Sequence, residues 1–264
     1  MAAYTAKDVA ALRQMTGAGM LDCKNALEET GGDLEAAAKL LRERGQAGAA
    51  KRSDREASQG AVAVAQTAEA AAVVELRCET DFVAKAEDFV ALTNELATLV
   101  AEKGEDAVAT RNDEVDRLRA TLKENISVGR VRRLEAGSGR VVDTYLHQQA
   151  GRGVNAVAVV LEGGSAELAH DIAVHIAFAK PAYLTRDEVP EAEVAAERET
   201  LETISRNEGK PEAALEKIVE GRLNGWFKER VLLDQAYVRD EKQSIAKMLG
   251  SARIVSFAQV VVGD

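Results

Sequence analysis

The sequence predicts an α+β protein in which a small helical domain precedes a core of two related lobes. Three features indicate this fold class: a series of helical patterns separated by glycines, an order of strand, strand, helix and strand that occurs twice, and a charged helical hairpin inserted in the second copy. The predicted boundaries are 1–45 for the helical domain, 46–59 for a linker, 60–138 for the first lobe and 139–264 for the second lobe, with the hairpin at 190–233.

The amino-terminal domain is expected to contain three short helices. Thr5 and Asp8 approximate a capping box before the first helix, the second is expected over residues 20–29, and Asp33 is placed to cap the third. The expected apolar positions of the first helix are Val9, Leu12 and Met15. Glycines are expected to end the helices, at Gly17-Ala18-Gly19, at Gly31-Gly32 and at Gly45. Residues 46–59 have no regular apolar face, so they are predicted to be a linker that is helical in part.

Each lobe is expected to be a small antiparallel sheet covered by helices. The first lobe is predicted to have strands at 60–66, 71–78 and 126–134 and a helix at 86–101. The second lobe is predicted to have strands at 141–147, 154–162 and 254–262 and a helix at 166–179. The alternative to a true repeat is a chance similarity between short strands.

Residues 190–233 are dense in Glu, Ala, Arg and Leu at helical spacing. The segment 207–211 is expected to be a turn, because it contains a glycine and ends in Pro211, which can start the next helix. We therefore predict an antiparallel helical hairpin whose charges form a solvated face.

The composition argues against several classes of function. The 34 Lys and Arg residues are outnumbered by 44 Asp and Glu residues, and the resulting net charge of −10 disfavours nucleic acid as a partner. No apolar run is long enough to span a bilayer and the first residues do not resemble a signal peptide, so we expect a cytoplasmic protein. Cys23 and Cys78 are expected to be reduced, buried thiols.

No catalytic or metal-binding pattern is visible. His170 and His175 do not have the i, i+4 spacing of a ligand pair on a helix, and the sequence contains neither a phosphate-binding loop nor a nucleophile elbow. We therefore expect no enzymatic activity, no metal, no cofactor and no nucleotide bound by the chain itself.

The segment Glu79-Thr80-Asp81-Phe82-Val83-Ala84 lies between a predicted strand and a predicted helix. An acidic residue beside the aromatic residue keeps such a turn hydrated, which favours an exposed Phe82 that a partner could bind. The alternative is that Phe82 folds beneath its own helix, which is the common position of a lone phenylalanine in a globular protein.

Four segments resemble, in order, those of one family, bacterial elongation factor Ts, the guanine-nucleotide exchange factor of elongation factor Tu. The segments are 12–27 (LRQMTGAGMLDCKNAL), 75–85 (ELRCETDFVAK), 175–183 (HIAFAKPAY) and 217–224 (KIVEGRLN). The resemblance covers essentially the whole chain. It implies a translation elongation factor that promotes GDP release and GTP exchange without covalent chemistry, by stabilising the nucleotide-free state of elongation factor Tu.

The resemblance also implies roles for particular residues. The turn of Thr80, Asp81, Phe82 and Val83 would insert near the Mg²⁺-binding region of the partner's nucleotide domain, with Phe82 as the wedge. Further partner contacts are implied for Lys24, His147, Tyr237 and Val238. For Lys24 the alternative is a solvated helix charge, and for His147 it is a histidine with satisfied hydrogen bonds at the edge of a sheet.

Two departures from the family pattern are expected to alter local contacts. The chain has Gln235-Ala236-Tyr237-Val238 where the family usually has Gln-Pro-Phe followed by Val or Ile, and Lys123 where members often have glycine. Two other functions remain as alternatives. The amino-terminal domain also resembles ubiquitin-associated domains, which suggests an adaptor that binds ubiquitin-like proteins, and a ribosome-associated or RNA-binding protein is the second alternative.

Overall fold

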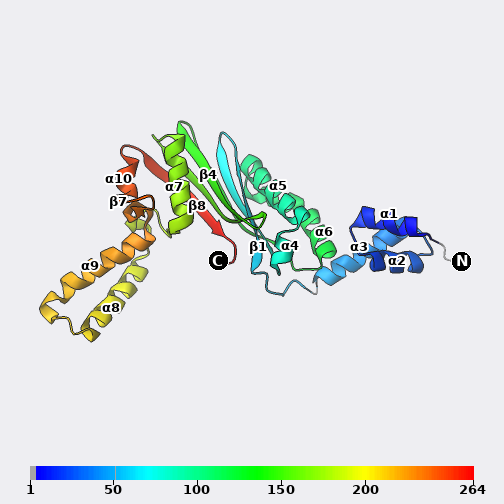
Figure 1. The fold of residues 1–264 in the computed structure, drawn as a ribbon, viewed down its shortest axis with the longest axis horizontal. Helices are drawn as coiled ribbons and strands as arrows, with labels where there is room; N and C mark the ends of the chain where they lie inside the picture. The colour runs from blue at the N-terminus through cyan, green and yellow to red at the C-terminus, as the bar shows by residue number, and fades with distance from the viewer. Residues whose placement is uncertain (1–3, 51) are drawn as a thin grey trace.

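The computed structural model describes residues 4–50 and 52–264, which form an elongated molecule with a helical domain at one end and a helical hairpin at the other (Figure 1). The core of two sheets lies between them. The predicted α+β class is confirmed, with small antiparallel sheets and helices on their outer faces.

The amino-terminal domain consists of α1 (Ala6–Thr16), α2 (Met20–Glu29) and α3 (Leu34–Ala50). The predicted capping box is present, because the Thr5 backbone N–H donates to the Asp8 carboxylate at 2.7 Å and the Asp8 N–H donates to Thr5 Oγ1 at 3.4 Å. A small apolar core holds the helices together, and its buried members are Val9, Leu12, Cys23, Ala26, Leu27 and Ala37. Met15 is not part of this core, contrary to the prediction, and its side chain is 64% exposed.

Helix α3 does not end at Gly45, contrary to the prediction, and continues to Ala50. The glycine has a packing role there, because a Cβ atom added to Gly45 would lie 2.7 Å from the Cβ atom of Ala120. The predicted linker is therefore helical through Ala50. The division into domains at the predicted boundaries stays a prediction.

The doubled order of strands is confirmed. The first sheet has the order β1 (Gln59–Gln66), β2 (Ala70–Cys78) and β3 (Ser127–Glu135), and the second has the order β4 (Arg140–Gln149), β5 (Arg152–Glu162) and β8 (Arg253–Val261). All neighbouring strands are antiparallel. In each sheet the central strand is the second in sequence, and its residues are buried on both faces.

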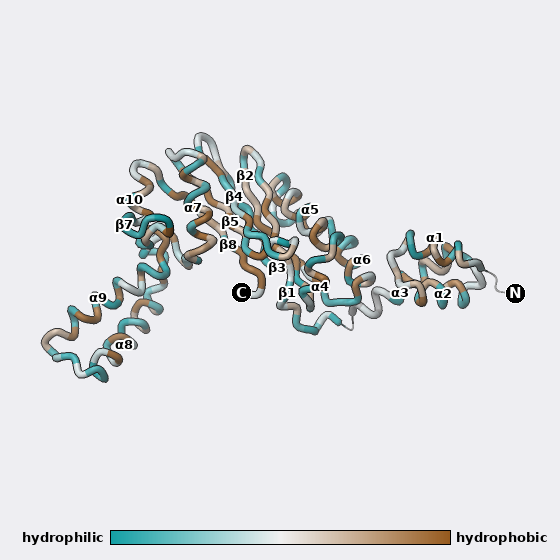
Figure 2. The backbone as a smooth tube through the Cα atoms, in the orientation of Figure 1, coloured by the Kyte–Doolittle hydropathy of each residue, from teal (hydrophilic) through white to brown (hydrophobic). Residues whose placement is uncertain are grey.

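The two sheets pack face to face, and each is covered on its other face by helices. In β2, Val74 and Leu76 face a core beneath α5 (Glu87–Lys103), whereas Val73 faces the second sheet. In β5, Val159 faces a core beneath α7 (Ala166–Ala179), while its neighbours face the first sheet. Figure 2 shows hydrophobic residues along these packed strands.

Several short elements were not predicted. They are η1 (Glu105–Arg111), α6 (Asn112–Leu122), η2 (Arg186–Glu188), η3 (Leu232–Asp234), β6 (Ala236–Tyr237), β7 (Asp240–Ser244) and α10 (Ile245–Leu249). Helix α6 contacts two parts of the molecule. Val115 and Leu118 pack into the core of the first lobe, while Ala120 and Thr121 lie against Gly45 and Gly17 of the amino-terminal domain.

The helical hairpin is confirmed as α8 (Glu191–Asn207) and α9 (Glu212–Arg230), joined by a short turn. Ion pairs connect the two helices, such as Arg198 with Glu220 at 3.1 Å. At the base of the hairpin, Leu223 and Phe227 pack with residues of neighbouring segments. Within the described parts of the chain, no helix has the length and apolar character needed to cross a membrane.

Candidate partner-binding surface

The predicted turn is a single helical turn, α4 (Asp81–Ala84), that follows directly after strand β2. Thr80 is its N-cap residue, with extended backbone dihedral angles, and its hydroxyl accepts the N–H of Val83 at 3.4 Å. Ala84 is fully buried in the core of the first lobe, and Val83 packs against the same core. The inner side of the turn is thus anchored, so its outer side keeps a defined position.

Phe82 lies on the outer side of this turn, and 82% of its surface is exposed. The alternative in which Phe82 folds beneath its own helix is wrong. Phe89, on α5, fills the core instead and is fully buried. The Phe82 ring is therefore accessible on a turn whose position is fixed.

Asp81 and Lys85 form an ion pair across α4, with Oδ2 and Nζ separated by 2.5 Å. The hydrogen bond from Lys85 lowers the pKa of the Asp81 carboxyl group, so this group is ionised at neutral pH. The Lys85 ammonium group also lies 5.9 Å from the centre of the Phe82 ring. The exposed ring is therefore flanked by one negative and one positive charge.

A surface hollow of about 620 Å³ lies beside the turn. One side is formed by residues of the turn, including Phe82 and Lys85, and the other by Gln149, Ala150 and Arg152 at the tip of the β4–β5 hairpin. Arg152 is nearly buried, and its guanidinium group donates to the backbone carbonyl of Gly60 at 2.5 Å. This bond fixes the second lobe's hairpin to the first lobe, next to the turn.

The other predicted contact residues lie on several parts of the molecule. His147 is exposed on β4, close in sequence to Gln149 at the hollow. Lys24 is exposed on α2, in the domain that also exposes Met15, Met20 and Leu21. The structure thus does not gather the predicted residues into one cluster, and the exposed positions lie on both the amino-terminal domain and the core.

Tyr237 and Val238 lie within the second lobe. The Tyr237 ring is only 7% exposed, with its centre 6.1 Å from that of the buried His175 ring, and Val238 packs against the same core. The Val238 N–H also points to His175 Nδ1 at 3.4 Å. These residues shape the second lobe from inside, and a direct contact between them and a partner stays a prediction.

The position of Lys123 explains how the chain accommodates the absence of glycine there. Lys123 ends α6 with φ 59° and ψ 29°, a left-handed conformation that glycine adopts more easily. Its ammonium group pairs with Asp22 on α2 at 2.8 Å. The lysine therefore keeps the backbone conformation and adds a contact to the amino-terminal domain.

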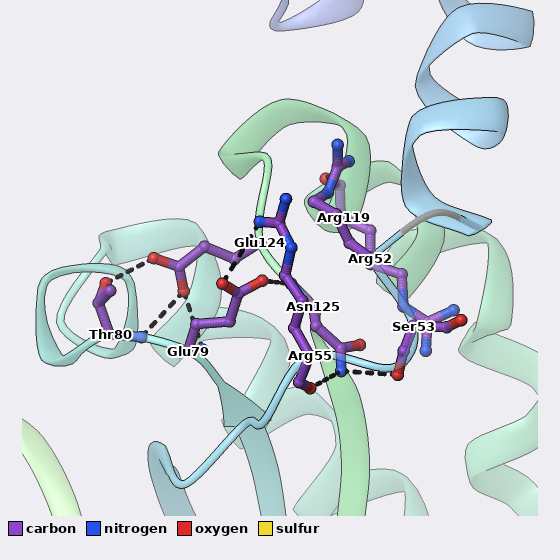
Figure 3. Close-up of polar contacts among 8 residues, drawn as sticks. All are labelled: Arg52, Ser53, Arg55, Glu79, Thr80, Arg119, Glu124 and Asn125. Carbon is purple, nitrogen blue, oxygen red and sulfur yellow. Dashed lines mark hydrogen bonds and ion pairs between the residues drawn. The ribbon is translucent and has the colours of Figure 1, made fainter.

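Sequence reasoning missed the polar groups that hold the turn in place. Glu124 and Asn125, directly after Lys123, bond to Glu79 and Thr80 across the first lobe (Figure 3). The one hint in the sequence is the neighbouring departure from the family pattern at Lys123. The sequence alone does not show which acidic residue contacts a turn that is distant in the chain.

Both predicted free thiols, Cys23 and Cys78, are confirmed as free and buried.

These features place the chain in a structural class: it is a two-lobed α+β protein with an exposed aromatic turn at the junction of its lobes. In the described residues, no group of three or more His, Cys, Asp or Glu side chains is arranged to hold a metal ion. The sequence model of the family described as Elongation factor TS matches residues 79–264.

Full-length relatives agree with that match. The chain is 46% identical to the elongation factor Ts of Kineococcus radiotolerans and 47% identical to that of Clavibacter sepedonicus, in both cases over 100% of each chain. The protein therefore belongs to the elongation factor Ts family and is a translation elongation factor.

Proposed function

We propose that this chain promotes GDP release and GTP exchange on elongation factor Tu. In this proposal the turn of Thr80, Asp81, Phe82 and Val83 inserts near the Mg²⁺-binding region of the partner's nucleotide domain. The observation that carries the proposal is the 82% exposure of Phe82 on a turn whose other side is anchored. The family resemblance assigns the wedge to the same residue.

The proposed mechanism needs no covalent step. A nucleotide-binding protein holds its ligand through backbone amides and Mg²⁺, and each 1.4 kcal/mol removed from these contacts weakens nucleotide binding about tenfold. A factor that binds the empty state more tightly than the loaded state must lower nucleotide affinity by the same ratio. Burying one phenylalanine side chain contributes about 1.5–3 kcal/mol, which is enough for a large shift when combined with other contacts.

We infer that the factor acts as a non-enzymatic, cytoplasmic protein without a metal or cofactor of its own. Additional contacts are proposed for Lys24 and His147, both of which are exposed, and for Tyr237 and Val238. Exposed apolar side chains at Met15, Met20 and Leu21 support a docking role for the amino-terminal domain. An adaptor for ubiquitin-like proteins would use this domain alone and leave the aromatic turn without a role.

The test is the release of fluorescent GDP from elongation factor Tu, measured by stopped flow with the wild-type chain and with Phe82→Ala. We expect the substitution to slow catalysed release by roughly one to three orders of magnitude, because truncating an interface anchor costs about 2–4 kcal/mol. The melting temperature should stay nearly unchanged, since the ring is exposed. Asp81→Ala should have the same effect more weakly.

Phe89→Ala serves as the control, because it removes the same side chain from the core of the first lobe. We expect it to cost about 3–5 kcal/mol of stability. If Phe82→Ala melts early like the control and retains full exchange activity while folded, the wedge role of Phe82 is excluded.

A further inference from the structure

A single carboxylate receives three hydrogen bonds from the start of the aromatic turn. Glu124 Oε2 accepts the backbone N–H groups of Glu79 at 3.0 Å and of Thr80 at 3.1 Å, and Glu124 Oε1 accepts the Thr80 hydroxyl at 2.5 Å (Figure 3). Glu124 lies in the connection between α6 and β3, far from the turn in sequence. Hydrogen bonds to an ionised acceptor are stronger than those between neutral groups, so this contact restrains the turn effectively.

The contact is reciprocal. Glu79 Oε1 accepts the backbone N–H of Asn125 at 2.6 Å, so each of the two segments supplies a carboxylate to the backbone of the other. The Asn125 amide group also donates to the backbone carbonyls of Ser53 and Arg55, at 3.1 and 2.7 Å, and the Arg55 guanidinium group pairs with Glu79 at 3.5 Å. The chain that arrives from the amino-terminal domain is thereby joined to the same network.

Helix α4 depends on such support because it is only four residues long. An isolated helical turn is unstable in water, and its first N–H groups have no partners within the helix. The Thr80 hydroxyl donates to Glu124, which leaves its oxygen lone pairs free to accept the N–H of Val83. Glu124 thus orients the N-cap of the turn that carries Phe82.

The preceding residue directs Glu124 toward the turn. Lys123, in the left-handed conformation, reverses the chain at the end of α6, and its side chain is tied to Asp22. A ring on an ordered turn meets the partner in one fixed direction, which the insertion step requires. The restraint therefore has a consequence for exchange as well as for the fold.

We propose that Glu124 is a positioning residue, which fixes the N-cap of α4 so that Phe82 is presented to the partner in one direction. This role rests on the proposed exchange function. Glu124 does not touch the partner in this proposal and acts only through the turn. The network of Glu79 and Asn125 keeps the Glu124 carboxylate in place.

The first test uses Glu124→Gln, in which an amide NH₂ group replaces one of the two accepting oxygens. Catalysed GDP release is measured over a range of elongation factor Tu concentrations. We expect kcat to fall by about 10- to 100-fold, because a misplacement of about 1 Å can lower a rate by a factor of up to about 100, while KM changes less than about threefold. The matched control is Glu114→Gln in the first turn of α6, at the opposite end of the helix from Glu124, where the carboxylate pairs with Arg111 at 3.8 Å.

The second measurement does not depend on exchange activity. Hydrogen–deuterium exchange of the full-length chain should show faster exchange over residues 79–84 in Glu124→Gln than in the wild type, with unchanged exchange in the two sheets. Thr80→Val, which removes the hydroxyl, should reproduce the loss of kcat, whereas Thr80→Ser should retain activity. The double variant of Thr80→Val and Glu124→Gln should be little worse than either single variant, because both remove the same contact.

The outcomes separate the two proposals. If Phe82→Ala slows GDP release and Glu124→Gln does not, the positioning role is overturned and the exchange function stands. If Glu124→Gln lowers the melting temperature but leaves kcat of the folded protein unchanged, Glu124 has a structural role only and the inference is also overturned. A wild-type chain that does not accelerate GDP release overturns both proposals.

Discussion

Phe82 and Phe89 are close in sequence and have opposite environments, since the first is 82% exposed and the second is fully buried. The difference arises from the backbone between them. Helix α4 ends at Ala84 and α5 begins at Glu87, so the two rings belong to different helices with different faces toward the sheet. The exposure of a single aromatic residue is thus decided by where its helix ends, and not by its own hydrophobicity.

The protonation of His175 makes the stability of the second lobe depend on pH. It is fully buried, and with Nε2 protonated it donates to Gln235 Oε1 at 3.0 Å while Nδ1 accepts the N–H of Val238. Burial lowers the pKa of His175 from its ordinary value of 6.5, and the hydrogen bond to Gln235 opposes this only in part. The folded protein therefore holds a neutral imidazole.

The sign of the resulting pH dependence follows from proton uptake. Below about pH 6.5 the unfolded chain binds a proton at His175 more readily than the folded chain does, so stability falls as the pH decreases toward the folded-state pKa. We expect the melting temperature of the wild type to fall between pH 7.5 and pH 5.5, and that of His175→Gln to fall less steeply from a lower starting value. His147→Gln, at an exposed position, should retain the wild-type slope. Parallel curves for all three proteins would contradict this assignment.

At the scale of elements, the crossing of α3 and α6 attaches the amino-terminal domain to the core. Gly45 lies at the crossing, where an added Cβ atom would meet the Ala120 Cβ atom at 2.7 Å. Glycine lowers the stability of a helix interior by roughly 0.5–1 kcal/mol relative to alanine. We infer that the close contact between α3 and α6, which a Cβ atom would obstruct, outweighs this loss.

We predict that Gly45→Ala destabilises the attachment of α3 to α6. Overpacking a tight contact costs about 1–3 kcal/mol, which exceeds the gain in helix propensity. Gly221→Ala is the matched control, because Gly221 is exposed within α9 and an added Cβ atom there has no neighbour within 4 Å. It should stabilise the hairpin by roughly 0.5–1 kcal/mol. Thermal denaturation distinguishes the two variants, and equal stabilisation by both would show that the crossing is not tight.

The elements that could be predicted are those with a strong local pattern. The central strands of both lobes are apolar runs, the helices of the hairpin have apolar residues at helical spacing, and Pro211 marks the turn before α9. Helix α6 was missed although Val115, Leu118 and Leu122 have the spacing of an amphipathic helix and pack into or against the core of the first lobe. A local pattern does not contain its second contact, which is with Gly17 and Gly45 of the amino-terminal domain.

The candidate site shows the same division between local and non-local information. Phe82, its acidic neighbour and the capping Thr80 could be identified because they are adjacent in sequence. Glu124 could not, because its role depends on the meeting of two segments that are distant in the chain. Tyr237 was predicted as a contact, and its burial beside His175 reflects the folding of β6 against α7.

At the scale of the whole molecule, the two lobes share a core and the amino-terminal domain does not. Residues of both sheets, such as Val73 and Val160, pack in one cluster between the sheets, and Arg152 and Gln66 form hydrogen bonds across the lobes. The amino-terminal domain has its own smaller core. Its described links to the rest include the contacts of Gly17 and Gly45 with α6 and the exposed ion pair of Asp22 with Lys123, which contributes at most about 1 kcal/mol.

We therefore predict that a chain lacking residues 1–50 still folds cooperatively but binds elongation factor Tu more weakly. The apolar clusters of both lobes consist of residues beyond position 60, so the deletion leaves them complete. Circular dichroism should show a single melting transition, and titration with elongation factor Tu should show reduced affinity. The deletion exposes one face of α6, including Ala120 and Thr121, so a modest decrease in melting temperature is expected. Loss of the cooperative transition would mean that the amino-terminal domain is part of the folding unit of the core.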